Sequence, residues 1–213
     1  LPILKNRISL LRSLVNDPDF LISIDQEGGT VARIRHSSTP PSAMIIANTE
    51  SFTISRAWAR YTARDLRECG INMNLAPVLD VNTESRNPVI NTRSFSESTE
   101  TVSNFGMDYI RTLSKASIIS TAKHFPGHGG SIKDSHFDLP IINHSLKQLN
   151  LIDIHPFVHA IQANVPVIMS AHVIYPALDP KLPATLSFPI STTLLRDDLG
   201  FKGVLITDDL NMA

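Results

Sequence analysis

The sequence predicts an α/β fold and, among α/β folds, a (β/α)₈ barrel of the TIM type. Apolar, β-branched runs alternate with segments of helical periodicity, as in a parallel sheet whose strands are buried on both faces. Polar residues capable of chemistry follow nearly every run, at the end that a barrel gathers around its active site. A doubly wound sheet is disfavoured, because no G-x-G-x-x-G phosphate loop follows the first run.

Each strand and helix is predicted in a definite place. The strands are expected at 20–25, 72–81, 117–125, 165–173 and 203–209. The helices are expected at 53–69, 97–115, 145–163 and 191–199. The opening segment LPILKNRISLLRSL has the pattern of an amphipathic helix, and loops are expected at 36–41 and 82–92. Because five strands do not complete a barrel, we expect residues 1–213 to form a single catalytic barrel domain that is truncated at both ends.

Length, charge and cysteine content exclude several classes of protein. The 213 residues are 42% hydrophobic, enough for a proper core, and the formal net charge of −1 gives no electrostatic case for nucleic acid or an anionic membrane. No apolar run approaches the length of a membrane span. The single cysteine, Cys69, excludes an internal disulfide and a cysteine-based zinc site. It fits a reducing compartment, and no signal peptide is visible, so a cytoplasmic location is expected.

Candidate ligand-binding residues stand at the ends of several predicted strands. Asp25 lies in SIDQEGGTVARI beside a tight Gly-Gly turn, and Arg33 is near enough in sequence to pair with it or to reach the same ligand. Carboxylates and a guanidinium suit a polyhydroxylated ligand, because they supply several fixed acceptors and donors. For Asp80, a site residue and a turn cap are equally supported. For His172, a core position and a pocket wall are equally supported.

The stretch KHFPGHGGSIKDSH, residues 123–136, has three interpretations. As a metal site it supplies ligands of the right type, namely His124, His128, Asp134 and His136. Proline and glycine, however, prevent the helix that would place the first two histidines on one face. As a catalytic loop it supplies Asp134 and His136, whose side chains point the same way in an extended segment, so that the carboxylate can orient the imidazole for proton transfer. A solvated polar loop is the third interpretation.

Two adjacent aspartates, Asp208 and Asp209, end the last apolar run, GVLITDD. Neighbouring side chains of an extended chain point to opposite faces, so one of the two carboxylates is expected to face the barrel mouth. An aspartate in that position can be a nucleophile, a metal ligand or a cap. A carboxylate held ionised by lysine, arginine or backbone donors, opposite a separate proton donor, is the arrangement that glycoside hydrolysis needs.

Several motifs together resemble the glycoside hydrolase family 3 β-N-acetylglucosaminidases of the NagZ type. They are DQEGGTVAR, NLAPVLDVN, RSFS, AKHFPGHG followed by DSH, MSAHV and LITDDLNM, and they occur in the order expected of that family from about residue 20 to the end of the chain. The resemblance implies a carbohydrate substrate with a terminal β-linked N-acetylglucosamine, typically from peptidoglycan fragments of the cell wall. It implies no metal and no cofactor.

Individual roles follow from the same resemblance, position by position. Asp208 matches the family nucleophile that attacks the anomeric carbon, and His136 matches an unusual general acid/base that is supported by Asp134. The family's sugar-binding residues match Asp25, Arg33, Arg93, Lys123 and His124. The sequence departs from the family pattern at Asn91, where a glycine is expected, and in the GGSIK segment after His128.

Other classes of function stay open at this point. One is a metal-dependent barrel hydrolase that uses His124, His128 and His136. Another is a non-catalytic sugar-binding remnant, which a truncated barrel would favour. Within the same fold, a broader β-glycosidase and a phosphorylase that uses phosphate as acceptor are further alternatives.

Overall fold

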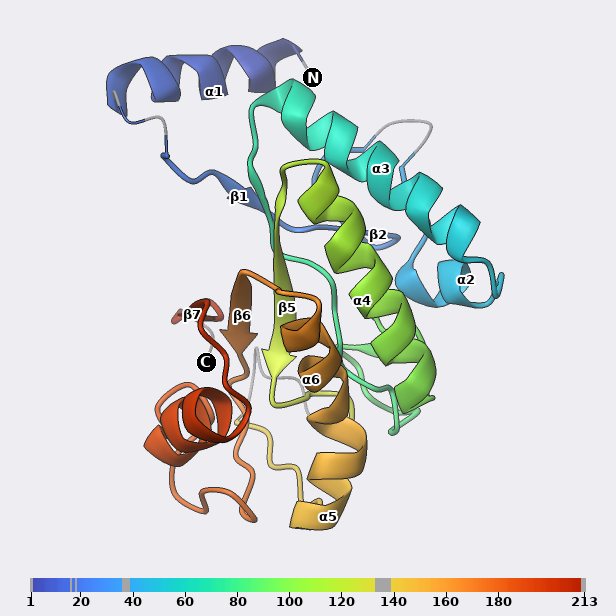
Figure 1. Ribbon diagram of the computed structural model, residues 1–213, viewed down its shortest axis with the longest axis vertical. Coiled ribbons are helices and arrows are strands. Elements are labelled where there is room, and N and C mark those ends of the chain that lie inside the picture. The colour runs from blue at the N-terminus through green and yellow to red at the C-terminus, as the bar shows by residue number, and fades with distance from the viewer. Residues whose placement is uncertain (1, 16, 18, 36–38, 133–138, 212–213) are drawn as a thin grey trace.

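One parallel sheet organises the fold. The computed structural model describes residues 2–15, 17, 19–35, 39–132 and 139–211, and its five-stranded sheet has the order β1 (Ser23–Ile24), β4 (Met73–Asn74), β5 (Ile119–Phe125), β6 (Val167–Ser170) and β7 (Val204–Thr207). Every neighbouring pair is parallel, and the order in space is the order in the sequence (Figure 1). The five predicted strands are therefore confirmed, although each is shorter than its apolar run.

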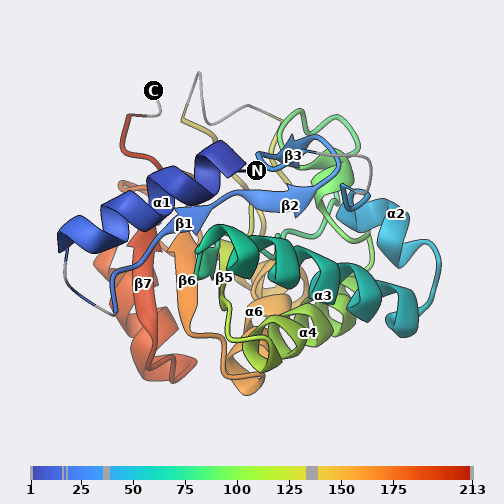
Figure 2. The same cartoon turned by 90° about the horizontal axis from the view of Figure 1, so that it is seen from above.

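The sheet curls into a half-barrel, which confirms the α/β prediction. Its connecting helices follow one another along one side, where neighbouring helices contact each other (Figures 1 and 2); they are α3 (Phe52–Cys69), α4 (Thr99–Lys115) and α6 (His155–Gln162). A closed barrel is not seen in the described residues, because β1 pairs only with β4 and β7 only with β6. The described sheet therefore has two open edges.

The helices start where serine side chains satisfy free backbone N–H groups. Ser51, Ser98 and Ser145 each accept a hydrogen bond in the first turn of a helix, namely α3, α4 and α5 (Leu146–Gln148). The amphipathic helix expected at the start of the chain is α1 (Pro2–Val15), and a short α2 (Ala43–Ala47) precedes α3. Within the part of the chain that the structure describes, no helix is long and apolar enough to span a bilayer.

Two helix predictions need correction. The helix predicted at 145–163 is broken, because α5 gives way to a π-helical segment, η2 (Leu149–Asp153), and α6 starts only at His155. Pro156 explains the break, since its nitrogen has no hydrogen to donate to a carbonyl of the preceding turn. The helix predicted at 191–199 is also π-helical and starts earlier, as η3 (Pro189–Asp198).

A β-hairpin follows β1 that the sequence did not predict; its strands are β2 (Gln26–Gly28) and β3 (Val31–Ala32). Gln26 is buried and ties the two arms together, because its Oε1 accepts the backbone N–H groups of Arg33 and Ile34, each at 2.9 Å. Gly28 has a φ of +107°, and a Cβ there would lie 2.3 Å from the carbonyl oxygen of Pro41. The turn therefore requires glycine, and it places the hairpin beside the carboxyl end of β1.

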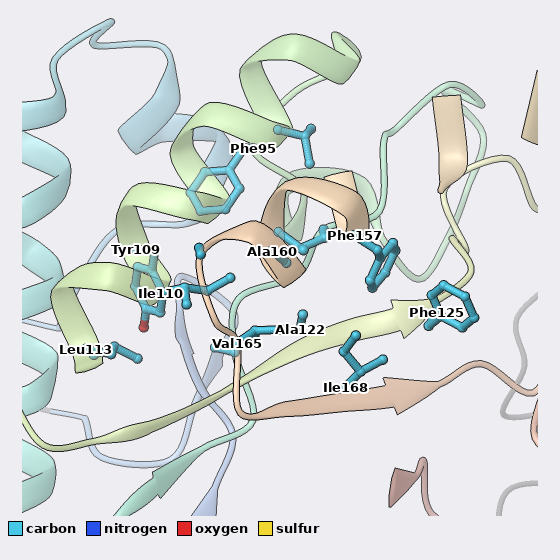
Figure 3. Packing of buried hydrophobic residues seen from close by; sticks show 14 of the residues in the cluster. Phe95, Tyr109, Ile110, Leu113, Ala122, Phe125, Phe157, Ala160, Val165 and Ile168 are labelled. Carbon is cyan, nitrogen blue, oxygen red and sulfur yellow. The ribbon is translucent and has the colours of Figure 1, made fainter. Parts of the chain in front are cut away.

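The main core lies between the helices and the sheet. Figure 3 shows α4, β5, α6 and β6 contributing side chains to one apolar cluster. Phe125 of β5 and Phe157 of α6 are fully buried and pack edge to face, with ring centroids 5.2 Å apart. This contact holds α6 against the strand that carries Lys123 and His124.

Replacing Phe157 with alanine should lower the free energy of unfolding by about 3–5 kcal/mol, because the substitution leaves a cavity under α6. Urea denaturation followed by circular dichroism measures the change. Phe188→Ala is the matched control, since Phe188 is 68% exposed, and it should cost less than about 0.5 kcal/mol. Similar losses in the two variants would show that Phe157 does not have the core position described.

Candidate functional site

One pocket at the carboxyl ends of the strands collects the described candidates for the active site. It has a volume of about 290 Å³ and is lined by Asp25, Val31, Arg33, Val89, Arg93, Lys123, His124, His128, Asp208 and Asp209. All five predicted sugar-binding residues and the predicted nucleophile are in this set. These six residues come from five segments: the chain after β1, the end of the β2–β3 hairpin, the 3₁₀ turn η1 (Asn91–Arg93), β5 and the chain after β7. The fold thus brings them together, while their individual roles stay predictions.

Lys123 lies in an ion network beside the pocket. Its Nζ is 3.0 Å from Asp25 Oδ1 and 2.8 Å from Glu27 Oε1, and its side chain is only 3% exposed. Arg93 contacts both oxygens of Glu27, at 2.9 Å through Nε and 2.8 Å through a terminal nitrogen. Arg33 makes the expected pair with Asp25, but at 3.7 Å and with a side chain that is largely exposed. The buried charges are therefore compensated within the protein, while Arg33 and part of Asp25 remain open to a ligand.

Glu27 is a site residue that the sequence analysis did not identify. Burial alone would raise its pKa, but the charge of Lys123 and the hydrogen bond and charge of Arg93 outweigh burial and lower the pKa to about 2. Glu27 is thus ionised at neutral pH and holds both cations in place. The DQEGG motif indicates a second carboxylate, Glu27, close to Asp25. The residues that pair with Glu27, Arg93 and Lys123, are distant in the sequence, so its role could not be predicted.

A single arginine in a loop is usually solvated, but Arg93 is mostly buried. Its side chain is only 16% exposed, and it also donates to the carbonyl oxygen of Val89. Asn91, where the family resemblance led us to expect glycine, has a φ of +40°. Asparagine tolerates this left-handed conformation better than most residues, so the substitution is compatible with the tight turn that delivers Arg93 to Glu27.

His124 is oriented by Asp80, which is fully buried and also binds the start of the glycine-rich turn after β5. Asp80 Oδ2 lies 2.7 Å from His124 Nδ1, and Asp80 Oδ1 accepts the backbone N–H groups of His124 and His128 at 3.1 and 2.7 Å. Burial would raise the pKa of Asp80, but its interactions with His124 and His128 lower it. An ionised Asp80 can only accept, so His124 Nδ1 carries a hydrogen and Nε2 is directed to the pocket.

Asp208 is held with one oxygen anchored and the other near the pocket histidine. Its Oδ1 accepts the backbone N–H of Asp209 at 2.8 Å, and its Oδ2 lies 3.7 Å from His124 Nε2. Lys123 and His124 are neighbours in β5, yet both side chains line the pocket. A regular strand would point them to opposite faces, and the strand register shifts at this point, between Lys123 and Phe125. Asp208 and Asp209 both line the pocket with Asp25 and Lys123, whereas the sequence predicted that one of the two carboxylates would face it.

His172 supports the chain after β7 and does not line the pocket. Its Nδ1 lies 2.8 Å from Thr185 Oγ1, and its Nε2 lies 3.1 Å from the carbonyl oxygen of Asp209. Both interpretations of His172 therefore need revision, since the ring is partly exposed and bridges β6 to the segment that carries the two aspartates.

The glycine-rich turn after β5, residues 127–130, brings His128 into the wall of the pocket. His128 is 2% exposed, and burial lowers its pKa. The other two candidates of this stretch, Asp134 and His136, lie outside the described residues, so their predicted role as an acid/base pair stays a prediction. Among the described residues, no three His, Cys, Asp or Glu side chains gather as a metal site.

A larger hollow, of about 520 Å³, lies between α3 and α4 and is lined by Arg56, Arg60, Asp108, Arg111, Thr112, Lys115 and Ala116. It contains none of the predicted site residues. Its acidic side chain, Asp108, is already paired with Arg56 at 2.8 Å. Of these two hollows we assign the site to the smaller one, because a partly exposed carboxylate, an oriented imidazole and buried cations converge there.

Comparison with known proteins places this fold and pocket in a family. Residues 9–213 match the model of the Glycosyl hydrolase family 3 N terminal domain. The chain therefore belongs to glycosyl hydrolase family 3, a family of glycoside hydrolases, which confirms the family that the motifs indicated.

Named relatives and solved structures agree with this family. The chain is 42% identical to "Beta-hexosaminidase A" of Pseudoalteromonas piscicida, over 90% of this chain and 35% of the relative, and 38% identical to "Beta-hexosaminidase" of Shewanella frigidimarina, over 92% and 59%. A family 3 β-N-acetylglucosaminidase from Paenibacillus superposes with a TM-score of 0.94 at 38% identity, covering 98% of this chain and 41% of that one. NagZ from Neisseria gonorrhoeae gives 0.91 at 34% identity, covering 99% and 62%. The chain thus spans less than two thirds of these proteins.

Glu27→Gln should flatten the acid side of the stability–pH curve. Because the pKa of Glu27 falls from 4.5 to about 2 on folding, its ionised form contributes about 3 kcal/mol of stability that is present above pH 4.5 and lost as the pH falls towards 2. Urea denaturation over this pH range measures the effect. Glu97→Gln, which changes an exposed carboxylate, should leave the curve unchanged. If the wild type and Glu27→Gln had the same acid limb, the buried network would not exist as described.

Proposed function

We propose that this chain is the catalytic domain of a retaining exo-β-N-acetylglucosaminidase on a (β/α)₈ barrel. The observation that carries the proposal is the position of Asp208, whose carboxylate lines the same pocket as Lys123 and the oriented His124. Membership of family 3 and the names of the relatives support the reaction class and the N-acetylhexosamine substrate. The pocket volume of about 290 Å³ is at the small end for ligand sites, which suits one terminal sugar residue.

Asp208 is the nucleophile of the proposed reaction. In the first step one of its oxygens bonds to the anomeric carbon while the bond from that carbon to the leaving oxygen breaks. His136, supported by Asp134, gives the leaving oxygen its proton. In the second step His136 takes a proton from water, the water oxygen bonds to the anomeric carbon, and Asp208 leaves. Two displacements at one carbon retain its configuration.

The remaining pocket residues hold the sugar. Asp25 accepts hydroxyl hydrogens, and Arg33, Arg93, Lys123 and His124 supply donors or further contacts. Because Glu27 and Asp80 fix three of these side chains before a sugar arrives, little ordering is left for binding, and binding free energy is available for orientation. We also propose that the sugar comes from peptidoglycan fragments, which rests on the resemblance of the motifs to the NagZ type. A cytoplasmic location remains a proposal as well, supported only by the free thiol of Cys69.

Asp208→Asn should reduce hydrolysis of an aryl β-N-acetylglucosaminide by roughly a thousandfold or more, because an amide is a poor nucleophile. Initial rates of phenol release measure this. Asp197→Asn, an exposed change of the same kind on η3, should retain full activity. The assignment fails if Asp208→Asn remains active, and it moves one residue along if only Asp209→Asn is inactive.

His136→Ala should affect substrates in proportion to their need for a proton on the leaving oxygen. We expect a loss of roughly a hundredfold or more for a β-linked disaccharide, and a much smaller loss for a nitrophenyl glycoside, whose leaving group departs without protonation. The ratio of kcat/KM for the two substrates measures this selectivity. Equal losses on both would remove His136 from the acid role.

A further inference from the structure

A second carboxylate–imidazole pair lies behind the glycine-rich turn and takes no part in the reaction proposed above. His144 Nδ1 lies 2.6 Å from Asp153 Oδ2, and the Asp153 side chain is fully buried while that of His144 is 22% exposed. The hydrogen bond to Asp153 raises the pKa of His144. Asp153 is the last residue of η2 and lies against Gly127 of the turn.

Each member of the pair contacts one glycine of the turn so closely that an added Cβ would displace something. A Cβ on Gly127 would lie 2.8 Å from Asp153 Cβ, and a Cβ on Gly130 would lie 2.9 Å from His144 Cε1. Such distances are below van der Waals contact, so the backbone of the turn lies directly on the imidazole and on the aspartate. The shape of residues 127–130 therefore depends on where these two side chains stand.

The same turn is also fixed by two other buried side chains. Tyr175 donates from its hydroxyl to the carbonyl oxygen of Gly127 at 2.8 Å, and Asn87 donates to the carbonyl oxygens of His128 and Gly129 at 3.0 and 3.2 Å. The backbone N–H of His128 binds Asp80, which orients His124. A shift of the turn would thus reach the pocket through His128.

We propose that His144 and Asp153 form a positioning pair, which sets the glycine-rich turn and through it the His128 wall of the pocket. The proposal rests on the proposed function. The pair acts through the backbone and does not touch the sugar. Because the proposed acid/base residues Asp134 and His136 follow this turn in the sequence, loss of the pair should impair proton transfer, while the buried cations still bind the sugar ring.

His144→Ala should lower kcat roughly tenfold for a β-linked disaccharide and much less for a nitrophenyl glycoside, with the affinity for free N-acetylglucosamine, measured by calorimetry, unchanged within about threefold. His144→Asn should recover most of the loss, because its amide nitrogen can replace Nδ1 as the donor to Asp153. His155→Ala removes a partly buried imidazole that contacts Ser103, not the turn, and should behave as wild type.

A double-mutant cycle tests the contact itself. Gly130→Ala forces a methyl group against the ring and should also lower kcat for the disaccharide, since the φ of Gly130 is accessible to alanine. In the His144→Ala background the ring is gone, and Gly130→Ala should then cost little. Additive losses, or equal losses on both substrates, would overturn the positioning role. An active wild type with an unimpaired His144→Ala would overturn this inference alone, whereas a wild type without turnover would overturn the proposed function first.

Discussion

The buried ammonium of Lys123 is the constraint on which the rest of the site depends. A cation that is 3% exposed is costly unless carboxylates surround it, and here Asp25 and Glu27 do so at 3.0 and 2.8 Å. Glu27 in turn holds Arg93. Compensation of this one charge therefore joins β5, the carboxyl end of β1, the unpredicted hairpin and η1 at one edge of the sheet. These ion pairs bring the segments that line the pocket together at the carboxyl ends of the strands.

Carboxylate–imidazole pairs extend the same principle beyond the cations. Asp80 holds His124 at 2.7 Å and also binds the start of the glycine-rich turn, while Asp153 holds His144 at 2.6 Å on the other side of that turn. Each of these two buried carboxylates thus holds an imidazole ring and also contacts the glycine-rich turn. A site assembled in this way keeps its geometry before a substrate arrives, and a glycosyl transfer that relies on positioning needs such a geometry.

The sequence predicted the parallel strands and their order, because long apolar runs and the residues that end them are local signals. For the same reason Asp25, Lys123, His124 and Asp208 could be expected in one pocket. It did not predict the role of Glu27, whose partner Arg93 is distant in the chain, or that Asp80 would bind both a histidine ring and the glycine-rich turn after β5. The broken helix at Pro156 was missed because an apolar helical period runs through it, and the described sheet is a half-barrel where a closed barrel fold was predicted.

The most direct test of the account is a crystal structure of the protein trapped with an activated 5-fluoro derivative of N-acetylglucosamine, which keeps the acetamido group at C2. We predict a covalent bond from Asp208 to the anomeric carbon, with ring hydroxyls within hydrogen-bond distance of Asp25 and Lys123 and with the Glu27–Arg93 pair intact. A sugar bonded to another residue, or bound away from Lys123 in the hollow between α3 and α4, would contradict the claim that the network around this lysine builds the active site.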